Sequence, residues 1–126
     1  MSVKLQSFVR VVIQNEKGES LVIFQKKWDC WVFPGGKIEP NETPLQAAKR
    51  EVWEETNIII KNLEIVDKKA FFSDEILKNK IGYLVKANEY LGEIKNKEVE
   101  KIADIQFRKI DYDFAINRPF YTIKFK

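Results

Sequence analysis

Residues 36–58 read GKIEPNETPLQAAKREVWEETNI, and the spacing within this stretch decides which fold the chain adopts. One glycine and five charged residues recur at fixed intervals in it: Gly36, Glu42, Arg50, Glu51, Glu54 and Glu55. Folded around a helix, they would gather several carboxylates and one guanidinium beside a glycine turn. Carboxylate oxygens bind divalent cations, and such cations bind phosphates. The stretch therefore predicts a metal site with affinity for phosphate groups.

A helix is predicted over residues 44–56, with recognisable signals at both ends. Thr43 can act as the N-cap, Pro44 suits the first helical position, and Gln46 completes a capping box. Asn57 follows the last helical residue, where asparagine tolerates the left-handed conformation that ends many helices. The same stretch therefore specifies where its helix begins and where it ends.

One side of this helix should combine apolar and acidic residues. Leu45, Ala48 and Val52 recur at helical spacing and should face a core. Glu51 and Glu55 lie beside them, where like charges four residues apart repel and burial adds to the cost. A hard cation such as magnesium or manganese would reverse that cost. A solvated acidic face is the ordinary alternative, but a chance match at all six positions has a probability on the order of one in ten million.

These residues resemble the signature of the Nudix hydrolases, G-x5-E-x7-R-E-U-x-E-E-x-G-U, in which U is apolar. The matching positions are Gly36, Glu42, Arg50, Glu51, Val52, Glu54, Glu55 and Ile58. Asn57 departs from the pattern, because the family has glycine there. The longer stretch WVFPGGKIEPNETPLQAAKREVWEE is similar to the MutT-type branch of the family. The resemblance implies an α+β fold, a Nudix-type α/β/α sandwich with a mixed sheet and a catalytic helix at about residues 44–56.

The resemblance also implies a metal site. A magnesium ion, with manganese as the alternative, would be held by four groups: Glu51, Glu54, Glu55 and the backbone carbonyl of Gly35. A further carboxylate from later in the chain would approach as ligand or base. Glu98 matches that place best and Glu100 is a close rival, although either could be a solvated loop acid.

Catalysis is expected to rest on Glu51, Glu54 and Glu98, with Arg50 orienting a carboxylate and Glu42 bracing the loop. Water would attack phosphorus in line, and the MutT-type reaction would give a nucleoside monophosphate and pyrophosphate. An RNA 5′-pyrophosphohydrolase and a catalytically silent nucleotide-binding module are the alternatives. Branches acting on ADP-ribose or diadenosine polyphosphates are disfavoured, because residues 73–75 are Ser-Asp-Glu where those branches have proline or tyrosine.

Substrate contacts are less sharply specified. Asn117 matches an asparagine with which this branch reads a purine edge, in particular that of an oxidised guanine, although it could instead cap a helix in the tail. Phe33 matches an aromatic residue of the base pocket, with core packing as the alternative. Lys26 and Lys37 could meet phosphates or be ordinary surface lysines. Trp28 and Trp31 could stack on a base, with half-buried packing as the safer expectation.

Composition narrows the possible chemistry. The chain has 126 residues, which suits one domain, and its net charge of +3 comes without a block of like charges. This charge suits a small polyanionic substrate and favours no stable nucleic-acid partner. The resemblance implies that the substrate is a nucleotide, and we expect a monomer or a homodimer. The absence of histidine excludes serine–histidine triads and histidine-bound zinc. The single cysteine, Cys30, is expected to be an inert packing residue, and no apolar run is long enough for a membrane, which together favour a cytoplasmic location.

The remaining sequence predicts mainly strands. They are expected at residues 7–14, 20–26, 31–33, 62–72, 80–89 and 102–109, with the first two forming a hairpin and Pro34-Gly35-Gly36 forming a turn. The tail, residues 111–126, is ambiguous because Tyr121, Ile123 and Phe125 alternate as in a strand. A last helix introduced by Asn117 is favoured there.

Overall fold

The computed structural model describes residues 7–73 and 78–126, so Asp74 and Glu75 lie outside the described residues. The elements in chain order are β1 (Phe8–Ile13), β2 (Ser20–Gln25), β3 (Cys30–Val32), β4 (Gly35–Lys37), α1 (Pro44–Thr56), β5 (Ile59–Ser73), β6 (Lys78–Leu91), β7 (Ile102–Arg108), α2 (Tyr112–Ile116) and the 3₁₀ helix η1 (Pro119–Tyr121). Across the described ranges, no helix has the length and apolarity needed to cross a membrane.

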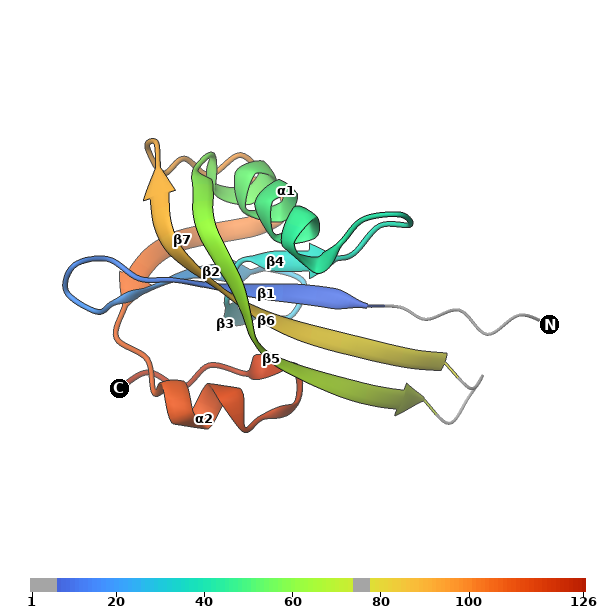
Figure 1. Ribbon diagram of the computed structural model, residues 1–126. Helices are drawn as coiled ribbons and strands as arrows, with labels where there is room; N and C mark the ends of the chain where they lie inside the picture. Colours follow the sequence, from blue (N-terminus) through green and yellow to red (C-terminus); the bar gives the residue numbers. More distant parts are fainter. Residues whose placement is uncertain (1–6, 74–77) are drawn as a thin grey trace.

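Two sheets form the framework of the molecule. The larger sheet has the order β4-β1-β6-β5, in which β1 runs parallel to β6 and antiparallel to β4. The smaller sheet has the order β3-β2-β7 and is antiparallel. Helix α1 lies on one side of the strands and α2 on the other (Figure 1). The mixed sheet and its two flanking helices confirm the predicted α+β class.

Helix α1 begins and ends where the sequence predicts. Thr43 accepts a hydrogen bond from the Gln46 backbone, and the Gln46 side chain accepts one from Thr43, so the capping box is complete. Asn57 ends the helix with φ of +69°, a left-handed conformation that asparagine adopts at modest cost. Its departure from the family glycine therefore leaves the helix end intact.

The predicted hairpin of the first two strands is wrong. Gln14 and Ser20 form a single isolated bridge, and β1 and β2 then diverge into different sheets. The reason is that both edges of β1 are already occupied, one by β4 and the other by β6. The predicted turn at Pro34-Gly35-Gly36 is also wrong in part, because Gly35–Lys37 forms the edge strand β4.

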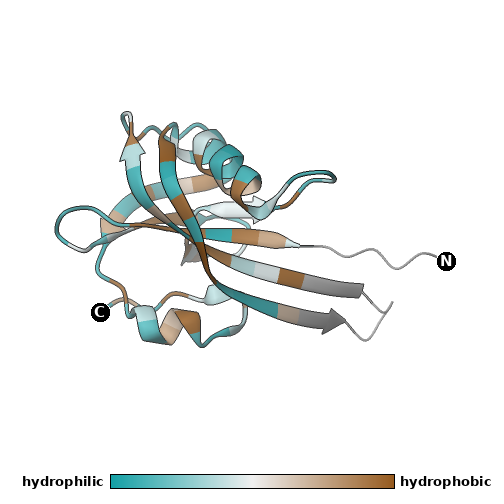
Figure 2. Cartoon of the chain, in the orientation of Figure 1, coloured by the Kyte–Doolittle hydropathy of each residue, from teal (hydrophilic) through white to brown (hydrophobic). Residues whose placement is uncertain are grey.

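Two groups of buried side chains flank the larger sheet. Val9 and Val11 point toward α1 and pack with its Ala48 and Val52, while Val12 points to the opposite face. Figure 2 shows hydrophobic residues along the central strands and hydrophilic ones over much of α1. Alternate residues of β1 therefore reach different environments, and the side chains on the face away from α1 matter for the site described below.

The tail does not form the helix predicted to start at Asn117. Asn117 instead caps the end of α2, donating from Nδ2 to the Asp113 carbonyl at 2.8 Å. The chain then forms η1 and returns to pair Phe125 with Ile110 in an isolated bridge. Each of the two readings of the tail, helix and strand, describes only part of it.

Candidate active site

Gly35 brings the edge strand β4 against its neighbours. Its φ is +150°, and a β-carbon there would clash with the backbone of Val9 on β1. The close approach lets the Gly35 N–H donate to Glu55 Oε1 of α1 at 2.9 Å. A glycine at this position therefore connects the sheet to the acidic face of the helix.

Glu55 is a carboxyl group enclosed by the fold. Its side chain is 3% exposed, and its one hydrogen bond within the described residues comes from Gly35. Burial raises the pKa of Glu55 to about 8, opposed by that hydrogen bond, while the negative charges of Glu51 and Glu98 raise it further. The charged form of Glu55 therefore lacks adequate compensation from the protein itself.

Arg50 connects the loop before α1 to the helix. Its Nε and Nη2 donate to the two carboxylate oxygens of Glu42 at 2.7 and 2.9 Å, and Nη2 also donates to the Lys37 carbonyl at 2.9 Å. The paired hydrogen bonds hold the pKa of Glu42 below its usual range. Nη1 donates to Glu51 at 2.8 Å and more weakly to Glu54 at 3.4 Å. Glu42 thus braces the arginine, and the arginine orients the helix carboxylates.

Glu51 lies in the space left by Gly36. A β-carbon on Gly36 would meet both carboxylate oxygens of Glu51, at 2.6 and 2.8 Å. Burial raises the pKa of Glu51, although the Arg50 hydrogen bond opposes this shift. Glu54 and Glu98 add further repulsion to its charged form.

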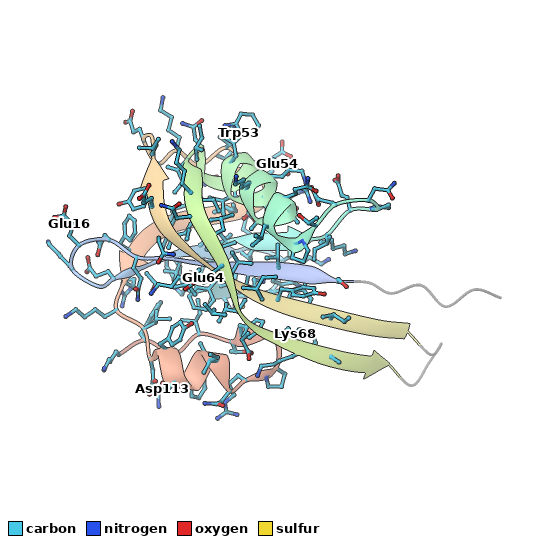
Figure 3. The ribbon with its side chains drawn as sticks, viewed as in Figure 1. Glu16, Trp53, Glu54, Glu64, Lys68 and Asp113 are labelled. Carbon is cyan, nitrogen blue, oxygen red and sulfur yellow. The ribbon has the colours of Figure 1, made fainter. Side chains whose placement is uncertain are left out.

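The segment after β6 docks on the carboxyl end of α1. The backbone N–H groups of Lys95 and Lys97 donate to the carbonyls of Thr56 and Glu55, at 2.9 and 3.2 Å. The Lys97 ammonium also lies 3.0 Å from the centre of the Trp53 ring, which projects from α1 away from the sheet (Figure 3). These contacts fix the residue that follows, Glu98, beside the helix.

Glu98 and Glu100 differ in their surroundings. The Glu98 side chain is 25% exposed, and its charge contributes to raising the pKa of both Glu51 and Glu55. Glu100 is exposed to solvent. The geometry therefore favours Glu98 over Glu100 as the carboxylate that joins those of α1.

The donor set fits a hard cation, although it is not a ready cage. Among residues 7–73 and 78–126, no three acidic or cysteine side chains already converge around a common point. Arg50 hydrogen-bonds to Glu51 and Glu54, and Gly35 to Glu55. All the available donors are oxygens, and a buried carboxyl with a raised pKa gains most from a divalent ion. Arg50 donates to only one carboxylate oxygen of Glu51 and of Glu54, so the other oxygen of each is left for a cation.

A cavity of about 760 Å³ adjoins this acidic cluster. Aromatic side chains from strands, from the turn between β2 and β3 and from the tail line it: Phe8, Phe24, Trp28, Trp31, Phe120 and Phe125. Gly36 and Lys37 also line it, and Gly36 is the residue in contact with Glu51. The cavity therefore lies next to the carboxylates of α1 through Gly36, although Glu51, Glu54 and Glu55 are not part of its lining. An aromatic lining beside an acidic cluster suits a ligand with an apolar ring at one end and anionic groups at the other.

The predicted substrate residues have different positions relative to this cavity. Lys37 lines it, whereas exposed Lys26 donates from Nζ to the Val99 carbonyl at 2.9 Å. Phe33 is fully buried in the group of side chains that includes Val12, on the side of the larger sheet away from α1. Its ring therefore has no surface available to stack on a base. Asn117 is exposed, caps α2 and is not part of the lining. Cys30 is exposed and lines the cavity, so its predicted role as a packing residue is wrong.

Sequence analysis missed Arg10, which lines the cavity although it is 8% exposed. Its Nη1 donates to the Phe33 carbonyl at 3.0 Å, and its guanidinium lies 5.4 Å from the centre of the Trp28 ring. Burial lowers the pKa of Arg10, opposed by the negative charges of Glu55 and Glu51. The available signal was one arginine inside an otherwise apolar strand, FVRVVI.

Comparison with known proteins agrees with this geometry. The NUDIX domain model matches residues 4–118. The 8-oxo-dGTP diphosphatase of Haemophilus influenzae is 33% identical over 97 residues, which are 74% of this chain and 70% of that protein. The RNA pyrophosphohydrolase of a Psychrobacter species is 34% identical over 58 residues, and the chain spans only 34% of that relative's length.

Solved structures with the same fold include two MutT proteins. A MutT Nudix hydrolase from Burkholderia pseudomallei aligns with a TM-score of 0.72 and 20% identity over 82% of each chain, which shows the fold alone. The MutT protein of Methanosarcina mazei aligns with a TM-score of 0.68 and 26% identity, over 85% of this chain and 78% of that one. With the matched domain and its signature residues, they show that this chain belongs to the Nudix hydrolases, in the MutT-like branch.

Proposed function

We propose that the chain is a magnesium-dependent pyrophosphohydrolase that converts nucleoside triphosphates to nucleoside monophosphates and pyrophosphate. The observation that carries this proposal is the aromatic cavity whose lining includes Gly36, the glycine that leaves space for the Glu51 carboxylate of α1, together with Lys37. A base and sugar in the cavity would direct the phosphate chain toward that acidic cluster. The oxidised dGTP named for the Haemophilus relative is one member of this substrate class.

The carboxylates would hold the cation through Glu51, Glu54, Glu55 and Glu98, with the Gly35 carbonyl as a further donor. Magnesium bound there would neutralise phosphate charge and promote ionisation of a water molecule. Arg50 would keep Glu51 in position, since it already donates to that carboxylate at 2.8 Å. Lys37 would meet the phosphates at the cavity mouth.

Glu54 suits proton transfer from the attacking water. Its side chain is 40% exposed, and its contact with Arg50 is long, at 3.4 Å. It can therefore rotate more easily than Glu55, which Gly35 holds. Glu98 is the second carboxylate that could accept this proton.

RNA 5′-pyrophosphohydrolysis is a second candidate, supported by the relatives that carry this name. Those matches cover 46% of this chain, whereas the cavity is of a size that encloses a single nucleoside. RNA would need further contacts along its backbone, with strong dependence on salt. We therefore rank free nucleotides first.

The test is a screen for magnesium-dependent pyrophosphate release. It should include ordinary and oxidised nucleoside triphosphates together with triphosphate-capped RNA. Glu54→Gln should lower turnover by orders of magnitude without unfolding the protein, while Glu16→Gln, in the β1–β2 turn (Figure 3), should have no effect. Equal rates for wild type and Glu54→Gln would refute the proposal, and release of orthophosphate instead of pyrophosphate would refute the assigned cleavage site.

A further inference from the structure

Arg10 is a buried cation directed into the cavity. Its neighbours Val9 and Val11 pack toward α1, so the arginine lies on the other face of β1, where Phe8 and Val12 also lie. It is 8% exposed and lines the aromatic cavity. A charge in such surroundings is unfavourable unless other groups compensate for it.

The protein satisfies only part of its hydrogen-bonding capacity. A guanidinium has five N–H donors and no acceptor. Within the described residues, Arg10 makes one hydrogen bond, to the Phe33 carbonyl, and one ring contact, with Trp28. The Phe33 bond fixes the guanidinium in place. The unused donors are then available to a ligand that presents acceptors inside the cavity.

The N–H donors of the Arg10 guanidinium limit which bases it could bind. Guanine presents two adjacent acceptors, O6 and N7, which is the pattern that arginine binds through two hydrogen bonds. Adenine replaces O6 with an amino donor, which would oppose the guanidinium. Oxidation of guanine at C8 places a hydrogen on N7 and converts that acceptor to a donor. Ordinary guanine therefore complements Arg10 better than adenine or 8-oxoguanine.

We propose that Arg10 is a specificity-determining residue that binds O6 and N7 of guanine, so that the cavity prefers unmodified guanine nucleotides. The inference rests on the proposed function, because it takes the cavity as the nucleoside site. It differs from recognition by Asn117, which the structure positions as the cap of α2. It also goes against a preference for the oxidised base.

Binding of nucleoside monophosphates tests this without any hydrolysis. In a Trp53→Phe background, the remaining tryptophans, Trp28 and Trp31, both line the cavity and would report binding by fluorescence. Without metal, GMP should bind about tenfold more tightly than AMP, 8-oxo-GMP or 7-deaza-GMP, which lacks the N7 acceptor. Equal affinity for GMP and 7-deaza-GMP would overturn the proposal, as would tighter binding of CMP.

Two variants test whether the guanine preference depends on the Arg10 side chain. Arg10→Met should remove the difference between GMP and 7-deaza-GMP, whereas the same change at exposed Arg118, which lies over Phe114 outside the cavity, should leave it intact. A uniform loss for every nucleotide and for ribose 5-phosphate would mean that Arg10 binds phosphate, and would overturn the assignment. A guanine preference in a protein that hydrolyses no triphosphate would support Arg10 and count against the proposed function. Because the 7-deaza comparison uses the unmutated cavity, it remains decisive if Arg10→Met does not fold.

Discussion

A β-carbon on Gly36 would lie 2.6 Å from the carboxyl carbon of Glu51, a separation that real β-carbons essentially never show. Gly36 is not among the glycines with positive φ, unlike Gly35. The first glycine of the signature is therefore needed for space beside a carboxylate, and not for an unusual backbone conformation.

Gly36→Ala should displace the Glu51 carboxylate and lower kcat/KM by about 10- to 100-fold, because small displacements of catalytic groups have effects of this size. Gly18→Ala is the matched control, since Gly18 has open space but φ of +75°. The control should lose about 1–2 kcal/mol of stability and keep its activity. Steady-state kinetics with urea unfolding would separate the two effects, and unchanged kcat/KM in Gly36→Ala would contradict this account of Glu51.

Glu98→Gln should lower kcat by at least tenfold, while Glu100→Gln should leave kcat near that of the wild type. The two substitutions are chemically identical and two residues apart, but only the Glu98 charge acts on both Glu51 and Glu55. Magnesium titrations should show that Glu98→Gln needs a higher magnesium concentration than the wild type to reach half of its maximal activity. Equal effects of the two variants would indicate that neither carboxylate has a specific role.

The metal-free protein should become less stable as the pH rises from about 5 to about 8, and Glu55 should be a main cause. Burial raises the pKa of Glu55 from 4.5 to about 8, so between these values the folded state binds its proton more tightly than the unfolded state does. The stabilisation is complete below the lower value and is lost as the pH rises through the upper one. Its size is on the order of a few kcal/mol.

Glu55→Gln keeps the neutral form at every pH and should flatten this dependence. Urea midpoints at pH 5 and pH 8 in chelator would measure it, with exposed Glu64→Gln as the control. Added magnesium should stabilise the wild type at pH 8 more than Glu55→Gln, because an ion that binds the folded state shifts the unfolding equilibrium. If the urea midpoint of Glu55→Gln changed between pH 5 and pH 8 as much as that of the wild type, groups other than Glu55 would cause the pH dependence of stability.

The parts of the fold that sequence analysis predicted best depend on local signals. Helix α1 has its cap, first-turn proline and left-handed terminator within residues 43–57, so its bounds follow from neighbouring residues. The hairpin prediction failed because the partners of β1 come from β4 and β6, which are distant in the sequence. Pairing between strands depends on competition for edges, and alternation within one strand does not reveal it.

The residues of the site also differ in how well the sequence predicts them, depending on whether they lie close together in the chain. The signature residues were recognisable because they lie within one stretch, residues 36–55, whereas the cavity combines side chains from strands, a loop and the tail. Arg10 was missed because an arginine in an apolar strand ordinarily points to solvent, and its contacts with the Phe33 carbonyl and the Trp28 ring come from residues that are distant in the sequence. Phe33 matched a pocket aromatic by position, but in the connection between β3 and β4 its side chain is fully buried.

Asn117→Ala should leave the ratio of kcat/KM for oxidised and ordinary dGTP unchanged. In the structure the Asn117 amide donates to the Asp113 carbonyl and lies outside the cavity, so the substitution should remove a helix cap and cost roughly 0.5–1.5 kcal/mol of stability. Kinetics with both nucleotides and thermal unfolding would measure the two quantities in one preparation. Asn88→Ala is a suitable control, because Asn88 is an exposed asparagine whose Nδ2 also donates to a backbone carbonyl, that of Asn62, at 2.8 Å. A change in the substrate ratio for Asn117→Ala but not for Asn88→Ala would mean that the tail rearranges on binding and brings Asn117 to the base, as the resemblance to the MutT branch implies.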